Sequence, residues 1–314
     1  MKYSVLAYYV ITEIKDPENA AREHREVLSK LDSRGRIYIG KEGINAQMSI
    51  NETDVEPYIN YLKNHSNFCD ADIKMHTSHE HAFEKLKIKV RDQLVAIDHK
   101  VDFSKRGEYL TPTKWAEMLE KRDENTILID VRNSYESRVG HFDGALKPDL
   151  ETFREFPKYA QDLKKTYNPN KTKVMMYCTG GIRCEYYSAL MKENGFDDVF
   201  HLKGGVIQYG NELGRKHWKG KLFVFDDRMN VPLDEGQTEV IATCHFCNEK
   251  NDTFYNCANM DCNALFTACP KCVAEHKGCC KELCLEQGRV RAFCPSENPK
   301  PFRKLSYEEK IVLK

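Results

Sequence analysis

The sequence predicts an α/β protein with three parts: an α+β sandwich, a doubly wound domain built on a parallel sheet, and a small cysteine-rich region that binds metal. Three observations predict this architecture. Strand-like and amphipathic helical segments alternate over residues 1–100, and near-continuous apolar strands alternate with helical patterns over residues 123–218. Three of the 13 cysteines precede position 244, so the other ten cluster in residues 244–294. A chain of 314 residues has room for two or three such domains.

Composition and charge limit the partners that we expect. Hydrophobic residues make up 41% of the chain and charged residues 31%, which is ordinary for a water-soluble protein. Lys+Arg and Asp+Glu both number 48, so no net charge attracts a polyanion, and a nucleic-acid site must be a local patch. No run approaches about 18 apolar residues, so we expect no membrane span.

The compartment in which the protein works determines whether its cysteines are expected to form disulfides. The segment "MKYSVLAYYVITEIKD" has a short apolar run but no small-residue cleavage site, so it resembles a strand more than an export signal. We therefore expect the cytoplasm. In that reducing compartment, cysteines more often bind metal or act in catalysis than form disulfides.

The first domain, residues 1–100, shows an alternation typical of a ferredoxin-like sandwich with the order β-α-β-β-α-β. The first helix contains Pro17 in its first turn, and Gly35 is expected to end it. The predicted elements are a strand at 3–11, a helix at 17–35, a hairpin at 36–50 turning at "KEGIN", a helix at 51–65 capped by Asn51 or Thr53, and a strand within 83–97.

The second domain follows a linker and entry helix at residues 101–122. "TPTKWAEMLEKRDE" predicts that helix, with Thr111 as its cap and Pro112 in its first turn. The runs "TILIDV", "KVMMYC" and "VFHLKGG" are the near-continuous apolar strands of a buried parallel sheet, spread over residues 123–218. The remaining parts are a connector at 219–243, the cysteine-rich region at 244–294 and a loosely ordered tail at 295–314.

The stretch "YCTGGIRCEYY" carries the chemistry that we expect of the second domain. Cys178 ends a parallel strand, at the sheet edge where ligands bind in open α/β folds. A loop with two glycines can turn its N–H groups inward as an anion-binding nest, and the N-terminus of the following helix adds positive potential. The side chain of Arg183 adds a full charge, so the pKa of the Cys178 thiol should be depressed. The predicted nest consists of Thr179, Gly180, Gly181 and Ile182.

Four motifs in order resemble the rhodanese family: "IDVRNSYES", "GHFDGA", "YCTGGIRC" and "HLKGGVIQYG". The resemblance implies that Cys178 is a nucleophile that carries a persulfide. The loop from Cys178 to Arg183 is one residue shorter than in related phosphatases, which favours sulfur over phosphate chemistry. Asp130 and Arg132 are expected to pair and brace the strand end, and His141 to stabilise its turn rather than act as a base.

Cys184 has two possible roles. It lies one residue beyond the loop, in the first turn of the predicted helix. It is either a small apolar residue packed under the loop or a resolving thiol for Cys178.

The C-terminal cysteines fall into four close pairs, and each pair can contribute two thiolates to one ion. Eight such ligands make two tetrahedral sites, and zinc fits best because the region has little apolar content and needs metal to fold. The alternative of an iron–sulfur cluster lacks a ferredoxin-type run. Pairing the first with the third pair, or pairing sequentially, satisfies the spacing equally. Cys279 and Cys294 are left over, and His245 and His276 are reserve ligands. The predicted ligands are Cys244, Cys247, Cys257, Cys262, Cys269, Cys272, Cys280 and Cys284.

The three parts together resemble the bacterial rhodanese-domain tRNA uridine hydroxylases, as do "GRIYIGKEGINAQMSI" and "YNCANMDCN". The resemblance implies oxygen-dependent formation of 5-hydroxyuridine at the wobble position of tRNA, with Cys178 essential and molecular oxygen as co-substrate. We find no flavin or NAD fingerprint and no set of two histidines and a carboxylate for iron. Two other functions stay open: a sulfurtransferase that passes persulfide sulfur from Cys178, and a non-enzymatic adaptor whose zinc region binds a partner.

Two groups of residues are candidates for contact with the anticodon region of tRNA, where unpaired bases stack on aromatic or arginine side chains. Each group taken by itself could instead be solvated surface, and the sequence does not fix the oligomeric state. The first group is Lys41, Asn45 and Arg91, and the second is Arg215, Lys216, Lys219 and Lys221 with His217 and Trp218 among them.

Overall fold

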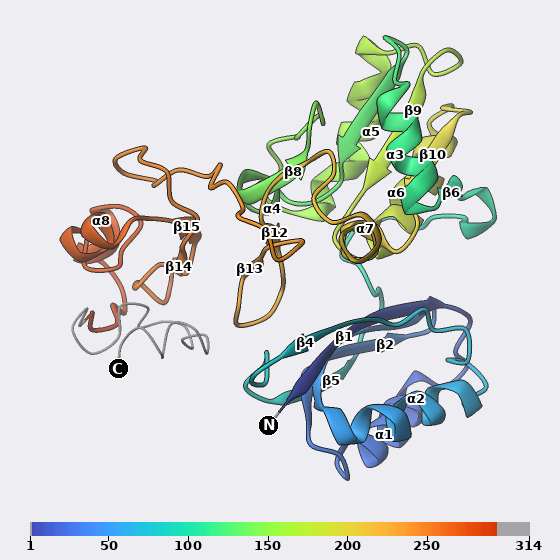
Figure 1. Ribbon diagram of the computed structural model, residues 1–314, viewed down its shortest axis with the longest axis horizontal. Helices are drawn as coiled ribbons and strands as arrows, with labels where there is room; N and C mark the ends of the chain where they lie inside the picture. Colours follow the sequence, from blue (N-terminus) through green and yellow to red (C-terminus); the bar gives the residue numbers. More distant parts are fainter. Residues whose placement is uncertain (1, 294–314) are drawn as a thin grey trace. The chain divides into compact units, whose positions relative to one another are not determined.

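The computed structural model describes residues 2–293 and divides into two compact units (Figure 1). The first contains Met1–Arg132 and Ala145–Gly214, and the second contains Asn133–Gly144 and the chain from Arg215 onward. Within residues 2–293, none of the helices has both the length and the apolar character that crossing a bilayer requires.

The first unit begins with a five-stranded sheet in the order β4-β1-β3-β2-β5. Its first four strands have the ferredoxin-like arrangement that the sequence predicts, and β5 adds an edge strand parallel to β2. The elements are β1 (Tyr3–Ile11), α1 (Pro17–Leu28), β2 (Ser33–Gly40), β3 (Gly43–Asn51), the short 3₁₀ helix η1 (Glu52–Asp54), α2 (Val55–Asn64), β4 (Lys74–Ser78) and β5 (Leu86–Val90).

Two details of this domain differ from the prediction. The helix predicted to end at Gly35 ends at Leu28, and Gly35 lies inside β2, where a Cβ atom would sit 2.5 Å from the Cβ of Met48. The glycine is therefore needed for close strand packing rather than for ending a helix. The fourth strand of the ferredoxin-like order is β4, a short polar strand missed from the sequence, whereas the strand predicted within 83–97 is the added β5.

The sheet has one helix-covered face and one without helices. Apolar residues alternate along β1, β2, β3 and β5, and Leu6, Ile37 and Met48 belong to the core beneath α1 and α2. Tyr9, Tyr38 and the residues that alternate with the core set point the other way. In the described chain, that second face faces no helix of its own domain (Figure 1).

The rest of the first unit is a parallel sheet in the order β6-β10-β9-β7, with helices on both faces. α5 packs with α6 and α3 with α7, which confirms a doubly wound domain. Strand β6 was missed because its three residues lie in the predicted linker. The elements are η2 (Phe103–Lys105), β6 (Glu108–Leu110), α3 (Pro112–Glu120), β7 (Thr126–Asp130), η3 (Phe153–Glu155), α5 (Phe156–Thr166), β9 (Lys173–Tyr177), α6 (Ile182–Glu193), β10 (Val199–Leu202) and α7 (Gly205–Leu213).

The second unit consists of short elements joined by turns. Its strands form three two-stranded ladders, which pair β8 with β11, β12 with β13, and β14 with β15. The elements are α4 (Ser134–Val139), β8 (Gly140–Phe142), β11 (Trp218–Gly220), β12 (Leu222–Phe223), β13 (Asn230–Val231), β14 (Phe254–Asn256), β15 (Leu265–Thr267), α8 (Pro270–Glu275) and α9 (Leu283–Glu286). The predicted tail lies outside the described residues.

Candidate active site and metal centres

Cys178 directly follows β9, at the carboxyl edge of the parallel sheet, and opens the loop that leads into α6. The helix begins at Ile182, slightly earlier than predicted, and Gly181 is its N-cap with φ of +103°. Only glycine adopts that backbone conformation without strain. The N–H of Gly181 points back into the loop and donates a 3.1 Å hydrogen bond to Cys178 Sγ.

The loop is held in this shape by the start of α7. The carbonyl oxygens of Cys178 and Thr179 accept hydrogen bonds of 3.0 Å from the N–H groups of Val206 and Ile207. A Cβ atom on Gly205 would lie 2.6 Å from both carbonyl oxygens, so no other residue permits this approach. With its outward carbonyls bound in this way, the loop leaves N–H groups to face the sulfur.

The surroundings of Cys178 make its thiol unusually acidic. Burial alone raises the pKa, but a hydrogen bond from the Cys184 thiol, the charge of Arg183 and the N–H groups of Gly181 and Cys184 together lower the pKa of Cys178 to about 6. The guanidinium of Arg183 is fixed by a 3.3 Å hydrogen bond to Thr179 Oγ1. At neutral pH the sulfur is therefore mainly a thiolate.

The thiolate is buried, yet the loop has an open side. Cys178 is 1% exposed. A Cβ atom built on Gly180 would meet no heavy atom within 4 Å, so the space beside that residue is open. A small reactant can therefore approach the loop at Gly180.

Cys184 lies under the loop, fully buried. Burial, and then its hydrogen bond to Cys178 and the charge on that sulfur, raise the pKa of Cys184 well above its usual value. It therefore remains a neutral thiol at physiological pH and donates its proton toward Cys178. This arrangement fits a hydrogen-bond donor that stabilises the Cys178 thiolate.

Asp130 and Arg132 form a buried pair at the end of β7. Arg132 donates from Nε and Nη2 to the two carboxylate oxygens of Asp130 at 2.8 and 2.6 Å, and Tyr177 donates its hydroxyl to Asp130 at 2.9 Å. The pair thus joins the ends of β7 and β9, next to Cys178. In the second unit, His141 Nδ1 lies 2.9 Å from the carbonyl oxygen of Ser137, which fits a turn-stabilising role.

The α+β domain contributes two side chains near the loop that the sequence did not reveal. A Cβ atom on Gly181 would lie 3.0 Å from Tyr9 Oη, so the Tyr9 ring lies against the loop. Lys74 is 3% exposed, and its Nζ lies 5.4 Å from the centre of the Tyr9 ring. A Cβ atom on Gly204 would lie 3.1 Å from Lys74 Cε. A tyrosine and a buried lysine therefore flank the Cys178 loop.

Glu185, in the first turn of α6, orients Tyr9, whereas Lys74 pairs with Asp72 at 3.3 Å. It is 1% exposed and accepts hydrogen bonds from Tyr9 at 2.6 Å, from Tyr109 at 2.8 Å and from Arg106 at 3.1 Å. The alternation of residues 3–11 indicates that Tyr9 faces away from Tyr8. Only the tertiary structure shows that the face carrying Tyr9 meets α6.

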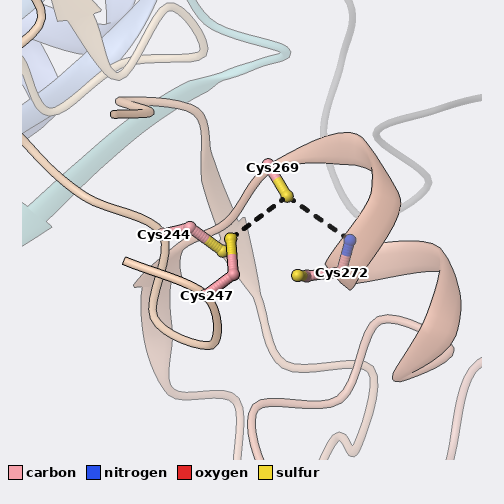
Figure 2. A group of neighbouring side chains, drawn as sticks. All are labelled: Cys244, Cys247, Cys269 and Cys272. Carbon is pink, nitrogen blue, oxygen red and sulfur yellow. Dashed lines mark hydrogen bonds between the residues drawn. The ribbon is translucent and has the colours of Figure 1, made fainter. Parts of the chain in front are cut away.

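The C-terminal cysteines form two groups of four. Figure 2 shows the first group, Cys244 and Cys247 with Cys269 and Cys272, and the second is Cys257 and Cys262 with Cys280 and Cys284. In each group the four sulfur atoms lie within 4.8 Å of one another. The first pair thus joins the third and the second joins the fourth, which decides between the two pairings that the spacing allows.

The sulfur separations fit a tetrahedral ion. They are 3.8 Å between Cys247 and Cys269 and 3.7 Å between Cys262 and Cys280. Four thiolates bound to zinc at about 2.3 Å lie roughly 3.8 Å apart, whereas a disulfide bond measures about 2.05 Å. Both groups can therefore hold a metal ion such as zinc.

The remaining cysteines and histidines of this region lie outside the two groups. Cys279 is buried but belongs to neither group within the described residues. His245 Nε2 lies 3.1 Å from the carbonyl oxygen of Cys280, and the His276 ring stacks on Phe246 at 3.8 Å between centroids. Cys294 lies outside the described residues.

Comparisons with known proteins cover almost the whole chain. Family models match at residues 3–94 (UPF0176 acylphosphatase like domain), 111–212 (rhodanese-like domain) and 219–285 (rhodanase C-terminal). The tRNA uridine(34) hydroxylase of Chlamydia felis (strain Fe/C-56) is 47% identical over 96% of this chain and 93% of its own. That of Protochlamydia amoebophila (strain UWE25) is 47% identical over 96% of this chain and 94% of its own. The chain belongs to the tRNA uridine(34) hydroxylase family.

Similarity to solved structures is lower. The single-domain sulfurtransferase RDL2 of Saccharomyces cerevisiae is 14% identical to this member of the hydroxylase family, covering 36% of this chain and 97% of its own with a TM-score of 0.31.

In this hydroxylase-family chain, the first group of RNA-contact candidates lies on or beside the helix-free sheet face. Asn45 is in β3, opposite both Tyr9 and Tyr38 in the strand register. The Arg91 guanidinium lies 5.5 Å from the centre of the Tyr38 ring, and Lys41 is exposed in the turn between β2 and β3. The fold thus brings Asn45 and Arg91 together around an aromatic ring.

The second group of candidates lies in the second unit of the family member, where carboxylates neutralise most of its charges. Arg215 Nε lies 3.7 Å from Asp234, Lys219 pairs with Asp143 at 2.6 Å, and Lys221 pairs with Asp252 at 2.8 Å. Lys216 is exposed, and His217 is half-buried. Trp218 is buried and donates to the carbonyl oxygen of Gly220, so its ring offers no stacking surface. These pairings weaken the attraction of this group for phosphate.

Proposed function

We propose that this chain hydroxylates the wobble uridine, uridine 34, of tRNA and that Cys178 is its reactive group. The observation that carries the proposal is an acidified thiolate inside an amide-lined loop, in a chain whose relatives over 96% of its length are named tRNA uridine(34) hydroxylase. The enzyme is in this view an oxidoreductase that forms 5-hydroxyuridine.

The reaction places one oxygen atom of O₂ between C5 of the uracil ring and its hydrogen, and the other oxygen atom leaves as water. Two electrons and two protons from an external reductant complete the balance. Cys178 acts as the nucleophile that adds to the ring, and Arg183 with the loop N–H groups from Thr179 to Cys184 stabilises the negative charge. The same nest can hold the terminal sulfur of a persulfide on Cys178.

Zinc serves a structural role in this proposal. Two ions, one in each group of four cysteines, stabilise residues 244–294, because zinc has no redox chemistry and four thiolates leave no open position. The part that contacts RNA is residues 1–100, and the part that carries the chemistry is residues 123–218.

The proposed partner is the anticodon region of a tRNA in the cytoplasm, because uridine 34 lies in an unpaired loop that a protein can open and stack on. Asn45 and Arg91 beside Tyr38 are the contacts that the geometry favours most, and exposed Lys41 adds a charge near them. Arg215, Lys216 and Lys219 remain proposed contacts of lesser weight, because two of them pair with carboxylates.

The experiment replaces Cys178 and measures the modified nucleosides of cellular tRNA by mass spectrometry. In cells whose only copy carries Cys178→Ser, 5-hydroxyuridine and its derivatives should fall to the level of cells without the protein. Cys69→Ser, which changes an exposed cysteine of the first domain, is the matched control and should retain the modification. Unchanged 5-hydroxyuridine in the Cys178→Ser cells contradicts the proposal. If the tRNA of cells without the protein lacks a sulfur atom instead of an oxygen atom, the protein is a sulfurtransferase. If the tRNA nucleosides of those cells are unchanged, the protein is an adaptor.

A further inference from the structure

The helix-free face of the first sheet carries two rows of side chains that run across all or most of its strands. Backbone register places the partners of each row side by side on the same face. The first row is Lys74, Ala7, Gln47, Arg36 and Lys87, and the second is Tyr9, Asn45, Tyr38 and Lys89. We call these nine residues the basic sheet face.

The five strands of this sheet contribute basic residues and no acidic ones, although Lys74 pairs with Asp72 just before β4. The sequences of β1 to β5 contain no aspartate or glutamate, and four cations belong to the two rows. Lys87 and Lys89, on the edge strand β5, are exposed. The acidic and basic residues of the whole chain are equal in number, so the exposed cations Arg36, Lys87 and Lys89 form a local positive patch of the kind that an RNA site requires.

The polar and aromatic groups of the face also suit bases. Tyr9 and Tyr38 flank Asn45 in the second row, one strand away on either side. Neighbouring strands are about 4.8 Å apart, so the two rings are roughly 10 Å apart with an amide between them. The guanidinium of Arg91, 5.5 Å from the centre of the Tyr38 ring, adds a planar cation.

The two rows lead toward the Cys178 loop. The second row begins at Tyr9, whose hydroxyl lies against Gly181 and donates to Glu185. At the same side, the first row begins at Lys74, beside Tyr9 and against Gly204. At the opposite end of the strands the face is covered, because His81 lies 2.9 Å from Ser49 Oγ. The open part of the face is therefore continuous with the candidate active site.

We propose that the basic sheet face binds the single-stranded nucleotides next to the uridine that reacts at Cys178. Lys87 and Lys89 contact phosphates, and Tyr38 stacks on a base. Lys74 is buried and pairs with Asp72 at 3.3 Å, so it positions Tyr9 beside the loop and does not contact phosphate. An unpaired RNA loop fits better than an acidic peptide, because the second row offers aromatic rings and an amide as well as cations. This inference rests on the proposed function for the identity of the RNA.

The test measures binding of the full chain to an anticodon stem–loop RNA. Binding is measured in the Cys178→Ser background, so that it does not depend on turnover. Lys87→Glu combined with Lys89→Glu should weaken binding about tenfold or more near 0.1 M salt, and should lower the slope of log affinity against log salt by about 1.4. The matched control is Lys30→Glu with Lys63→Glu, which makes the same charge change at exposed positions on the helix side of this domain.

A second pair of variants tests the aromatic part. Tyr38→Phe keeps the ring and should bind as the parent does, whereas Tyr38→Ala should lose about tenfold in affinity. The stem as a blunt duplex should bind more weakly than the stem–loop, and a polyglutamate peptide should not compete at equal charge concentration.

The outcomes separate this inference from the proposed function. Equal loss of affinity in the control charge variants, or unchanged affinity in Lys87→Glu with Lys89→Glu, overturns the inference even if Cys178 proves essential for 5-hydroxyuridine. Effective competition by polyglutamate also overturns it, in favour of an acidic protein partner. The face variants could instead lose affinity as expected while Cys178→Ser cells keep their 5-hydroxyuridine. That result would contradict the proposed role of Cys178 and support the basic sheet face as an RNA-binding surface.

Discussion

The cysteine at position 178 and the eight cysteines of the metal groups differ in what surrounds their sulfur atoms. The Cys178 sulfur receives hydrogen bonds from Gly181 and Cys184 inside a core built from a parallel sheet and its helices. In the C-terminal region each ligand sulfur lies within 4.8 Å of three other sulfurs, and six of the eleven buried residues of its core are cysteines. The Cys178 thiolate is thus stabilised by hydrogen bonds and by the charge of Arg183, whereas the C-terminal cysteines form groups of four that a bound cation would stabilise.

The difference shows how one residue type serves two purposes. Hydrogen bonds lower the pKa of Cys178 and leave its lone pairs free to react. Metal ligation lowers the pKa of a thiol too, but it uses the lone pair and supplies the folding energy of the region. The two sites should therefore respond to different perturbations.

Removing the metal should have the largest effect. It should affect the C-terminal cysteine-rich region and leave the Cys178 site intact. Structural zinc contributes roughly 10–16 kcal/mol of apparent binding free energy per site, so chelation should unfold residues 244–284. Hydrogen exchange there should accelerate, while β9 and α6 around Cys178 keep their protection. Retained protection of residues 244–284 in metal-free protein would contradict the structural role.

The adjacent residues Cys279 and Cys280 allow a matched test of which cysteines bind metal. Cys280→Ser should reduce the metal content from two ions to one per chain, because Cys280 lies 3.7 Å from Cys262 Sγ in the second group. Cys279→Ser changes an adjacent buried thiol outside both groups and should retain two ions. Elemental analysis of the purified variants gives the count, and loss of an ion from Cys279→Ser would assign the ligand differently.

The second largest effect should be in the pH dependence of alkylation, which should distinguish Cys178 from an ordinary cysteine. A pKa of about 6 means that Cys178 loses its thiolate form as the pH falls through 6, and that its ionisation is nearly complete above pH 7. The rate of carbamidomethylation at Cys178, followed by peptide mass spectrometry, should rise around pH 6 and level off by about pH 7.5. An ordinary cysteine, with a pKa near 8.5, should still gain reactivity up to about pH 9. A midpoint above pH 8 at Cys178 would show that the nest does not acidify it.

The smallest expected effect concerns the neutral thiol beneath the loop. Cys184→Ala removes a donor to the thiolate, so the pKa of Cys178 should rise by about one unit, since hydrogen bonds to charged groups contribute roughly 1.5–3 kcal/mol. Cys184→Ser keeps a donor and should largely preserve both the alkylation midpoint and tRNA hydroxylation. Equal loss of hydroxylation in the Ser and Ala variants would instead support the resolving-thiol role.

How much of the fold could be predicted depended on the length and pattern of each segment. Near-continuous apolar runs identified β7 and β9, and Thr111 with Pro112 identified the start of α3. Strands β4 and β6 were missed because they are five and three residues long and half-exposed, so neither has a clear period. Their place in the sheets comes from backbone pairing with β1 and β10, which local sequence does not encode.

The sequence by itself determined the chemistry available to this protein: a cysteine at a strand end followed by glycines and an arginine, and four cysteine pairs with metal-ligand spacing. Local geometry suffices for these, since the atoms involved lie within a few residues of one another. Only the tertiary structure decided which cysteine pairs share a site, and that Tyr9 and Lys74 lie beside the Cys178 loop. The cysteine pairs that share a site are separated by other elements of the region, and the contacts of Tyr9 and Lys74 join positions more than 100 residues apart, as in the hydrogen bond from Tyr9 to Glu185. These contacts exist only because packed elements fix the relative positions of distant segments.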